Sequence, residues 1–195
     1  MGLDWFEYKK QLHPPLLVKS VVELRIYGFT NTPRNLLVAL KKSIDNQYSS
    51  LFTPVSVHPD LLPLPEEGYD SQRRQYLAEP FLKVLDDVVA PTLHALALVN
   101  LDLFVSRLNF IFGLAQVGGN ALVALPRLKP SFYQLPSDDA LYFQRIVIEA
   151  LHELGHVLGL GHCENYCVMR FSNTLADTDQ KPAKYCRTCF QKLVR

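Results

Sequence analysis

Residues 152–162 have the sequence HELGHVLGLGH and carry the strongest signal in this 195-residue chain. Residues four apart on an α-helix lie on the same face, so His152 and His156 can offer imidazole nitrogens to one metal ion about 2.0–2.1 Å away. Glu153 follows the first of these ligands, in the position from which a carboxylate can take a proton from a water molecule bound to the metal. The stretch therefore predicts a zinc site on a helix, with a general base beside it.

The residues after this helical pair complete the predicted site. Gly159 comes three residues after His156, where a helix that ends and turns back needs a residue that tolerates positive φ. The turn would bring His162 to the ion as a third ligand, and three protein ligands leave the fourth position open, as in catalytic zinc sites. A bare HExxH could also be two surface histidines on a helix. The glycine and third histidine at these offsets favour the metal site.

The chain has four cysteines, Cys163, Cys167, Cys186 and Cys189, which form a CxxxC and a CxxC separated by a loop. This spacing is typical of a tetrahedral site with four thiolates, although two disulfides would also use four cysteines. Residues 1–10 contain two acidic side chains and do not resemble a secretory leader. We therefore expect a reducing compartment, the cytoplasm, in which thiolates bind zinc and do not form disulfides.

Taken together, these motifs resemble those of the archaemetzincins, a family of metzincin zinc peptidases, over the segment from His152 to Cys189. The resemblance implies two zinc ions per chain, a catalytic one on the three histidines and a structural one on the four cysteines. It also implies that Met169 lies in a tight turn beneath the catalytic metal without being a ligand, where an ordinary core methionine is the alternative. One departure is that three residues separate Cys163 from Cys167, where the family usually has four.

Composition sets bounds on the rest of the chain. With 48% hydrophobic and 20% charged residues, residues 1–195 can form one compact domain. We expect an N-terminal subdomain over residues 1–160, which includes the site helix, and a C-terminal subdomain over residues 161–195 with the methionine turn and the cysteine cluster. The net charge of +1 gives no bulk electrostatic attraction to nucleic acid, so we expect none as a partner, and the apolar runs are too short to span a membrane. A monomer that acts on peptide or protein substrates is expected.

Strand and helix patterns alternate along the chain, and turn residues separate them. The expected strands are Val21–Phe29, Ser50–Val57, Leu96–Val105, Phe110–Val117 and Ala121–Leu125. The expected helices are Asn35–Asp45, Gln75–Val89 and Leu141–Leu158. A Gly-Gly-Asn sequence at residues 118–120 predicts a tight turn between the last two strands. These patterns predict an α/β (α+β) fold with a mixed sheet.

The helix that carries the histidines has a recognisable start, since Ser137 can cap it ahead of two aspartates. It is apolar nearly all round, so we expect it to be buried. The metzincin resemblance implies a mainly parallel twisted sheet with a backing helix and this active-site helix, plus a small four-cysteine zinc subdomain. It also implies that Phe110–Val117 is an antiparallel edge strand along which an extended substrate binds.

The function predicted is zinc-dependent hydrolysis of peptide bonds, in which Glu153 assists the attack of zinc-bound water. The alternative is a non-catalytic zinc-binding module that contacts nucleic acid or a protein partner through the cysteine cluster and a basic tail. The tail consists of Lys181, Lys184, Arg187, Lys192 and Arg195. Glu149 lies one helical turn before His152 and could orient it, but the expectation is a simple helix-face carboxylate. Residues 129–136 are expected to cover the cleft.

Overall fold

The computed structural model describes residues 22–194. Three parts of the sequence predictions lie outside the described residues. They are the absence of a leader at residues 1–10, the strand residue Val21 and the tail residue Arg195. Within residues 22–194, no helix is both long enough and apolar enough to cross a membrane.

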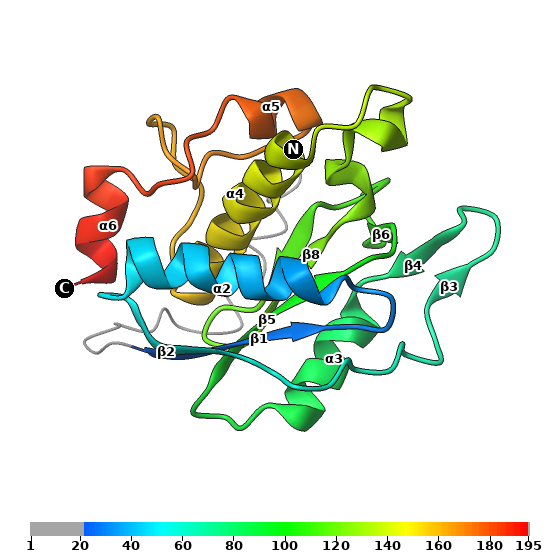
Figure 1. The fold of residues 1–195 in the computed structure, drawn as a ribbon, viewed down its shortest axis with the longest axis horizontal. Coiled ribbons are helices and arrows are strands. Elements are labelled where there is room, and N and C mark those ends of the chain that lie inside the picture. Colours follow the sequence, from blue (N-terminus) through cyan, green and yellow to red (C-terminus); the bar gives the residue numbers. More distant parts are fainter. Residues whose placement is uncertain (1–21, 195) are drawn as a thin grey trace.

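A five-stranded sheet forms the centre of the fold, in the order β2-β1-β5-β8-β7 (Figure 1). Its strands are β1 (Val22–Gly28), β2 (Phe52–Val57), β5 (His94–Val99), β7 (Gly113–Ala115) and β8 (Ala121–Ala124). The first four in spatial order are mutually parallel, and β7 pairs with β8 in the antiparallel direction. The predicted mixed, mainly parallel sheet is therefore confirmed.

Helices cover both faces of this sheet. On one face lie α2 (Arg34–Tyr48) and α4 (Asp139–Val157), and α3 (Glu79–Val88) lies on the other. Successive side chains of a strand point to opposite faces. Accordingly Leu96 and Leu98 of β5 join the core under α2 and α4, while Ala97 joins the core under α3. The helix α2 is thus the expected backing helix, and α4 is the expected site helix.

A second, three-stranded sheet accounts for two errors in the predicted elements. It consists of β3 (Tyr69–Asp70), β4 (Gln75–Leu77) and β6 (Leu103–Phe104). The helix predicted to begin at Gln75 begins only at Glu79, because the preceding residues pair with β6 and the Ala78 N–H donates to the Phe104 carbonyl. The strand predicted from Leu96 to Val105 divides into β5 and β6, which belong to different sheets.

The predicted strand Phe110–Val117 is shorter in the structure, where only Gly113–Ala115 is regular. It is an edge strand, as expected, because β7 ends the strand order and pairs on one side only. The turn that joins it to β8 is closed by a 2.9 Å hydrogen bond from the Gln116 N–H to the Asn120 carbonyl, and Gly118 there has a φ of 71°. The predicted tight turn is therefore confirmed.

The helix α4 is capped one residue later than predicted. Asp138 has extended backbone angles, and its side chain accepts a hydrogen bond of 2.9 Å from the Leu141 N–H. Ser137 is therefore not the cap, because the helix begins at Asp139 and Asp138 supplies the oxygen that its first turn needs. From Arg145 to Val157 every residue is buried, which agrees with the expectation for a central helix.

The remaining elements are short. They are the 3₁₀ helices η1 (Pro126–Leu128) and η2 (Pro130–Tyr133), followed by α5 (Leu175–Asp179) and α6 (Arg187–Leu193). Of these, η1 and α5 contact the first half of α4 through Arg145. Apolar side chains of residues 167–193 belong to the same buried cluster as those of α2 and α4. The boundary predicted between residues 160 and 161 stays a prediction.

Candidate metal centre and cleft

Three histidines converge at the C-terminal end of α4. His152 and His156 are buried on one face of the helix, and His162 reaches them from the turn that follows. The candidate ligand atoms of the three residues all lie within 4.8 Å of one another. The turn depends on Gly159, whose φ of 88° is the left-handed conformation expected of this glycine.

The hydrogen bonds of two of these histidines determine which ring nitrogen faces the centre. The Nδ1 atom of His152 lies 2.9 Å from the Val168 carbonyl, and that of His156 lies 2.8 Å from the Leu160 carbonyl. A carbonyl only accepts, so each Nδ1–H donates and each neutral ring presents an Nε2 lone pair. Burial lowers the pKa of both histidines well below the usual value, which keeps the rings neutral.

The two Nε2 atoms are 3.0 Å apart. Two lone pairs at this distance repel each other unless a proton or a cation lies between them. A metal ion bound to both nitrogens satisfies both acceptors at once, and neutral imidazole is a preferred zinc ligand. The donor set and its fixed tautomers therefore fit a zinc ion.

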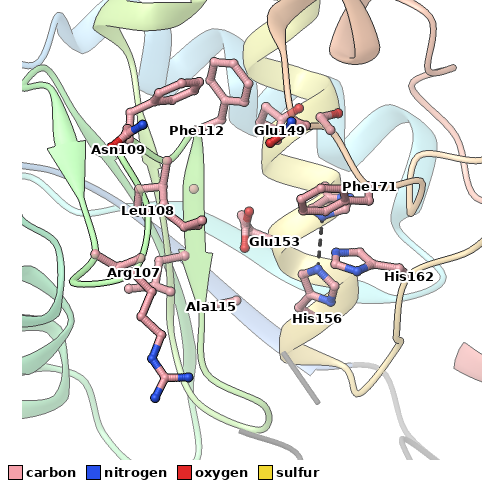
Figure 2. A pocket seen from close by; sticks show the side chains of 18 residues that line it. Arg107, Leu108, Asn109, Phe112, Ala115, Glu149, Glu153, His156, His162 and Phe171 are labelled. Carbon is pink, nitrogen blue, oxygen red and sulfur yellow. Dashed lines mark hydrogen bonds between the residues drawn. The ribbon is translucent and has the colours of Figure 1, made fainter. Parts of the chain in front are cut away.

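The Glu153 carboxylate lies beside the histidines and faces β7 (Figure 2). Burial raises the pKa of Glu153 well above its usual value, the nearby Glu149 raises it further, and Lys181 opposes the rise. Across the cleft, a Cβ atom added to Gly113 would lie 2.5 Å from Glu153 Oε1, closer than side chains pack. The space for the Glu153 carboxylate thus depends on a glycine at the edge strand.

Gly113 is a functional residue that the sequence analysis did not identify. It lies in a stretch of strand-forming residues, and a glycine within a strand often marks a close approach of another group. That signal was present, but it does not say which group approaches. Which group approaches Gly113 depends on the packing of β7 against α4, and these two elements lie side by side along the cleft.

Met169 is fully buried and packs against the helix below the histidines. A Cβ atom on Gly155 of α4 would overlap the Met169 sulfur, so the methionine occupies the space that this glycine leaves. The Met169 carbonyl accepts a hydrogen bond of 2.9 Å from the Cys163 N–H. Met169 thus packs against α4, and its hydrogen bond connects the cysteine cluster to the segment that follows the histidine turn.

The four cysteines form a second cluster next to the first. Their sulfur atoms lie within 4.8 Å of one another, and the Sγ atoms of Cys163 and Cys186 are 3.9 Å apart. A tetrahedral site with zinc–sulfur bonds of about 2.3 Å places its sulfurs about 3.8 Å apart. All four thiols are free, which disagrees with the disulfide alternative. The cluster fits a structural zinc ion.

One of these thiols is predisposed to lose its proton. Burial is the largest single influence on the pKa of Cys186 and raises it, but the hydrogen bonds from the Cys189 N–H and from neighbouring thiols together outweigh burial and lower the pKa to about 7. The Cys186 N–H in turn donates to Cys167 Sγ over 3.2 Å. Thiolates are the form that zinc binds, so these hydrogen bonds favour the metal site.

Glu149 and Lys181 are both buried, which differs from the environments predicted for them. Glu149 is 3% exposed and Lys181 is 3% exposed, and the Lys181 Nζ lies 3.1 Å from Glu149 Oε1. Glu149 Oε1 also accepts a hydrogen bond of 2.9 Å from Thr178. Glu149 is therefore a buried ion-pair partner and not a simple helix-face carboxylate. Lys181 does not contribute to a basic surface, which weakens the nucleic-acid alternative.

The histidines and Glu153 open into a cleft of about 310 Å³. One wall is the edge strand with the residues before it, 105–115, and the other is α4 with residues 171–173. Residues 129–136 do not line this cleft. The structure therefore does not support the prediction that they cover the cleft.

The fold and the site together define the class of the protein, a zinc metallopeptidase with metzincin architecture. Comparison with known proteins identifies the family. The model of Peptidase family M54 matches residues 65–195. The archaemetzincin of Pyrococcus furiosus is 43% identical over 167 residues, which cover 83% of this chain and 86% of that protein. The chain belongs to Peptidase family M54, the archaemetzincins.

Solved structures agree with this assignment. The crystal structure of archaemetzincin from Archaeoglobus fulgidus has a TM-score of 0.75 and 33% sequence identity, covering 88% of this chain and 99% of that one. The archaemetzincin from Methanopyrus kandleri gives a TM-score of 0.74 and 33% identity, covering 89% and 94%. The resemblance noted from the motifs is thereby confirmed, and so are the predicted fold class and enzyme class.

Proposed function

We propose that His152, His156 and His162 hold the catalytic zinc ion and that Glu153 is the general base for peptide-bond hydrolysis. The observation that carries this proposal is the position of the Glu153 carboxylate, which faces the cleft beside the three ligand nitrogens. A bound zinc ion would supply Lewis-acid chemistry there, which polarises a carbonyl and acidifies water. The donor chemistry described above supports this role for the histidines.

The chain's own residues perform the remaining steps. The free edge of β7 offers backbone groups to an extended peptide, which adds as a further strand and is held with its scissile bond in front of Glu153. Glu153 accepts a proton from the attacking water and then donates it to the amine that leaves. Gly113 keeps the opposite wall far enough away for the carboxylate to make this transfer.

We further propose that Cys163, Cys167, Cys186 and Cys189 hold a structural zinc ion that fixes the position of His162. Cys163 is the residue after His162, and its N–H is bonded to the Met169 carbonyl. A metal ion that holds the Cys163 side chain would restrict the peptide unit that carries the third histidine. The cluster therefore supports the catalytic centre and does not itself contact substrate.

The proposal also includes the cellular compartment and the oligomeric state of the protein. Four free thiols gathered at metal-binding distances favour a reducing compartment, such as the cytoplasm. We also propose that the chain acts as a monomer, because every residue assigned a role in hydrolysis comes from one chain. Light scattering of the purified protein would test the second point.

The experiment compares the wild type with Glu153→Gln and with Asp87→Asn, a control that removes one carboxylate from the exposed surface of α3. We expect both variants to retain two zinc ions per chain by metal analysis. Glu153→Gln should lose peptide cleavage by about 10²-fold or more, as expected for a general base, whereas the control should cleave normally. Full activity of Glu153→Gln would refute the proposed role.

A further inference from the structure

Glu149 is a second carboxylate in the cleft that the hydrolytic mechanism does not use. It lies four residues before Glu153, so both side chains are on the same face of α4 and both line the cleft. In Figure 2, Glu149 lies at the end of the cleft occupied by Phe112, whereas Ala115 lies nearer to His156. A group bound at this end would therefore be adjacent to, but separate from, the reacting atoms.

Only one member of the ion pair between Glu149 and Lys181, the carboxylate, faces the cleft. The Lys181 ammonium is almost inaccessible, with a side chain 1% exposed, and Lys181 does not line the cleft. Both the Lys181 and Thr178 contacts fall on Oε1 of Glu149. The ammonium thus lies behind the carboxylate, and Oε2 remains to accept a hydrogen bond from a ligand in the cleft.

Aromatic side chains form much of the cleft wall near this carboxylate, and in Figure 2 Asn109 lies beside Phe112 at the same end. The rings of Phe110 and Phe112 are in contact, with centroids 5.3 Å apart, and both line the cleft together with Phe171. Ser172 also lines it, and its buried Oγ has no hydrogen-bond partner among residues 22–194. A pocket with aromatic walls and an acceptor at its end suits a long side chain with an alkyl stem and a cationic tip.

The direction of β7 determines which part of a substrate reaches this end. The chain of β7 runs from Phe112 towards Ala115, and antiparallel pairing is the more stable arrangement for an added strand. A peptide paired in this way runs from the Ala115 end towards the Phe112 end. The residue that follows the scissile bond then lies on the side of Glu149.

We propose that the end of the cleft formed by Glu149 and Phe112 binds the side chain of a lysine or arginine directly after the cleaved bond. This inference rests on the proposed function, because it names a substrate class for the same cleft. Glu149 is a specificity residue here, with Lys181 and Thr178 holding its carboxylate in place. The enzyme would then release products that begin with a basic residue.

The test uses two peptides that differ only in this residue, lysine in one and norleucine in the other, which has the same length of stem but no ammonium. We expect the wild type to have a kcat/KM about tenfold higher for the lysine peptide, the size of one charged hydrogen bond. In Glu149→Gln/Lys181→Met, which removes both charges together and keeps an acceptor for Thr178, the two peptides should be cleaved equally. Equal cleavage by the wild type, or an unchanged lysine preference in the double variant, would overturn the proposal.

Binding measurements separate this inference from the proposed function. The zinc-loaded Glu153→Gln protein should bind the lysine peptide about tenfold more tightly than the norleucine peptide in fluorescence anisotropy. If the wild type cleaved neither peptide, the proposed function would fail, and this binding ratio would still decide the subsite. A ratio near one overturns the subsite alone. Asp87→Asn, in the same background, removes an exposed carboxylate of α3 and should leave the ratio unchanged.

Discussion

The contact between Gly113 and Glu153 gives a prediction whose size follows from the structure. In Gly113→Ala the new Cβ would lie 2.5 Å from Oε1, 2.6 Å from Cγ and 2.7 Å from Cδ of Glu153. Ordinary contacts at such positions are 3.4–4 Å, so the carboxylate or the strand has to move by about 1 Å. The strand is held by its pairing with β8, and therefore Glu153 is the group that moves.

A displacement of about 1 Å in a catalytic group can reduce the rate by about 10²-fold. We therefore expect Gly113→Ala to lower kcat/KM by about this factor while zinc content stays at two ions per chain. The assay is hydrolysis of a quenched fluorescent peptide, together with metal analysis and a thermal melt. Ala115→Gly is the matched control, because it changes the same strand without adding an atom near Glu153. A Gly113→Ala enzyme within threefold of the wild type would refute the reasoning.

Three further predictions concern stability and metal content. Gly155→Ala should destabilise the protein by about 1–3 kcal/mol in chemical denaturation, because its Cβ overlaps the Met169 sulfur, and an unchanged midpoint would contradict this packing. Cys167→Ser should lower the zinc content from two ions to one and lower the melting temperature, and two retained ions would exclude Cys167 as a ligand. Lys181→Met alone should cost about 3–5 kcal/mol because it leaves Glu149 buried without its counter-charge; a loss below about 1 kcal/mol would show that the pair is unimportant.

The candidate metal centre was predictable because its ligands are close in the sequence. The spacing of His152 and His156 fixes their relation on any helix, and Gly159 has the left-handed conformation that the turn to His162 requires. The cysteine motifs likewise bring their members together locally in two pairs. Such short-range geometry depends little on the rest of the fold, so the sequence was sufficient to identify it.

The features that were missed depend on contacts between distant segments. Residues 75–77 have a pattern compatible with a helix, and only their pairing with β6 makes them a strand. The approach of Gly113 to Glu153 joins the edge strand to α4, and the ion pair of Glu149 with Lys181 joins α4 to the segment after α5. No local pattern in the sequence indicates which residues meet in this way, because tertiary packing decides it.

The central claim is that a zinc ion bound to His152, His156 and His162 lies beside Glu153. The most direct test is crystallography of the zinc-loaded protein at the zinc absorption edge, which locates each metal ion by its anomalous signal. We expect two peaks per chain, one among the ring nitrogens of the three histidines and one at the centre of the four sulfurs. A fully loaded protein with no peak at the histidines would contradict it.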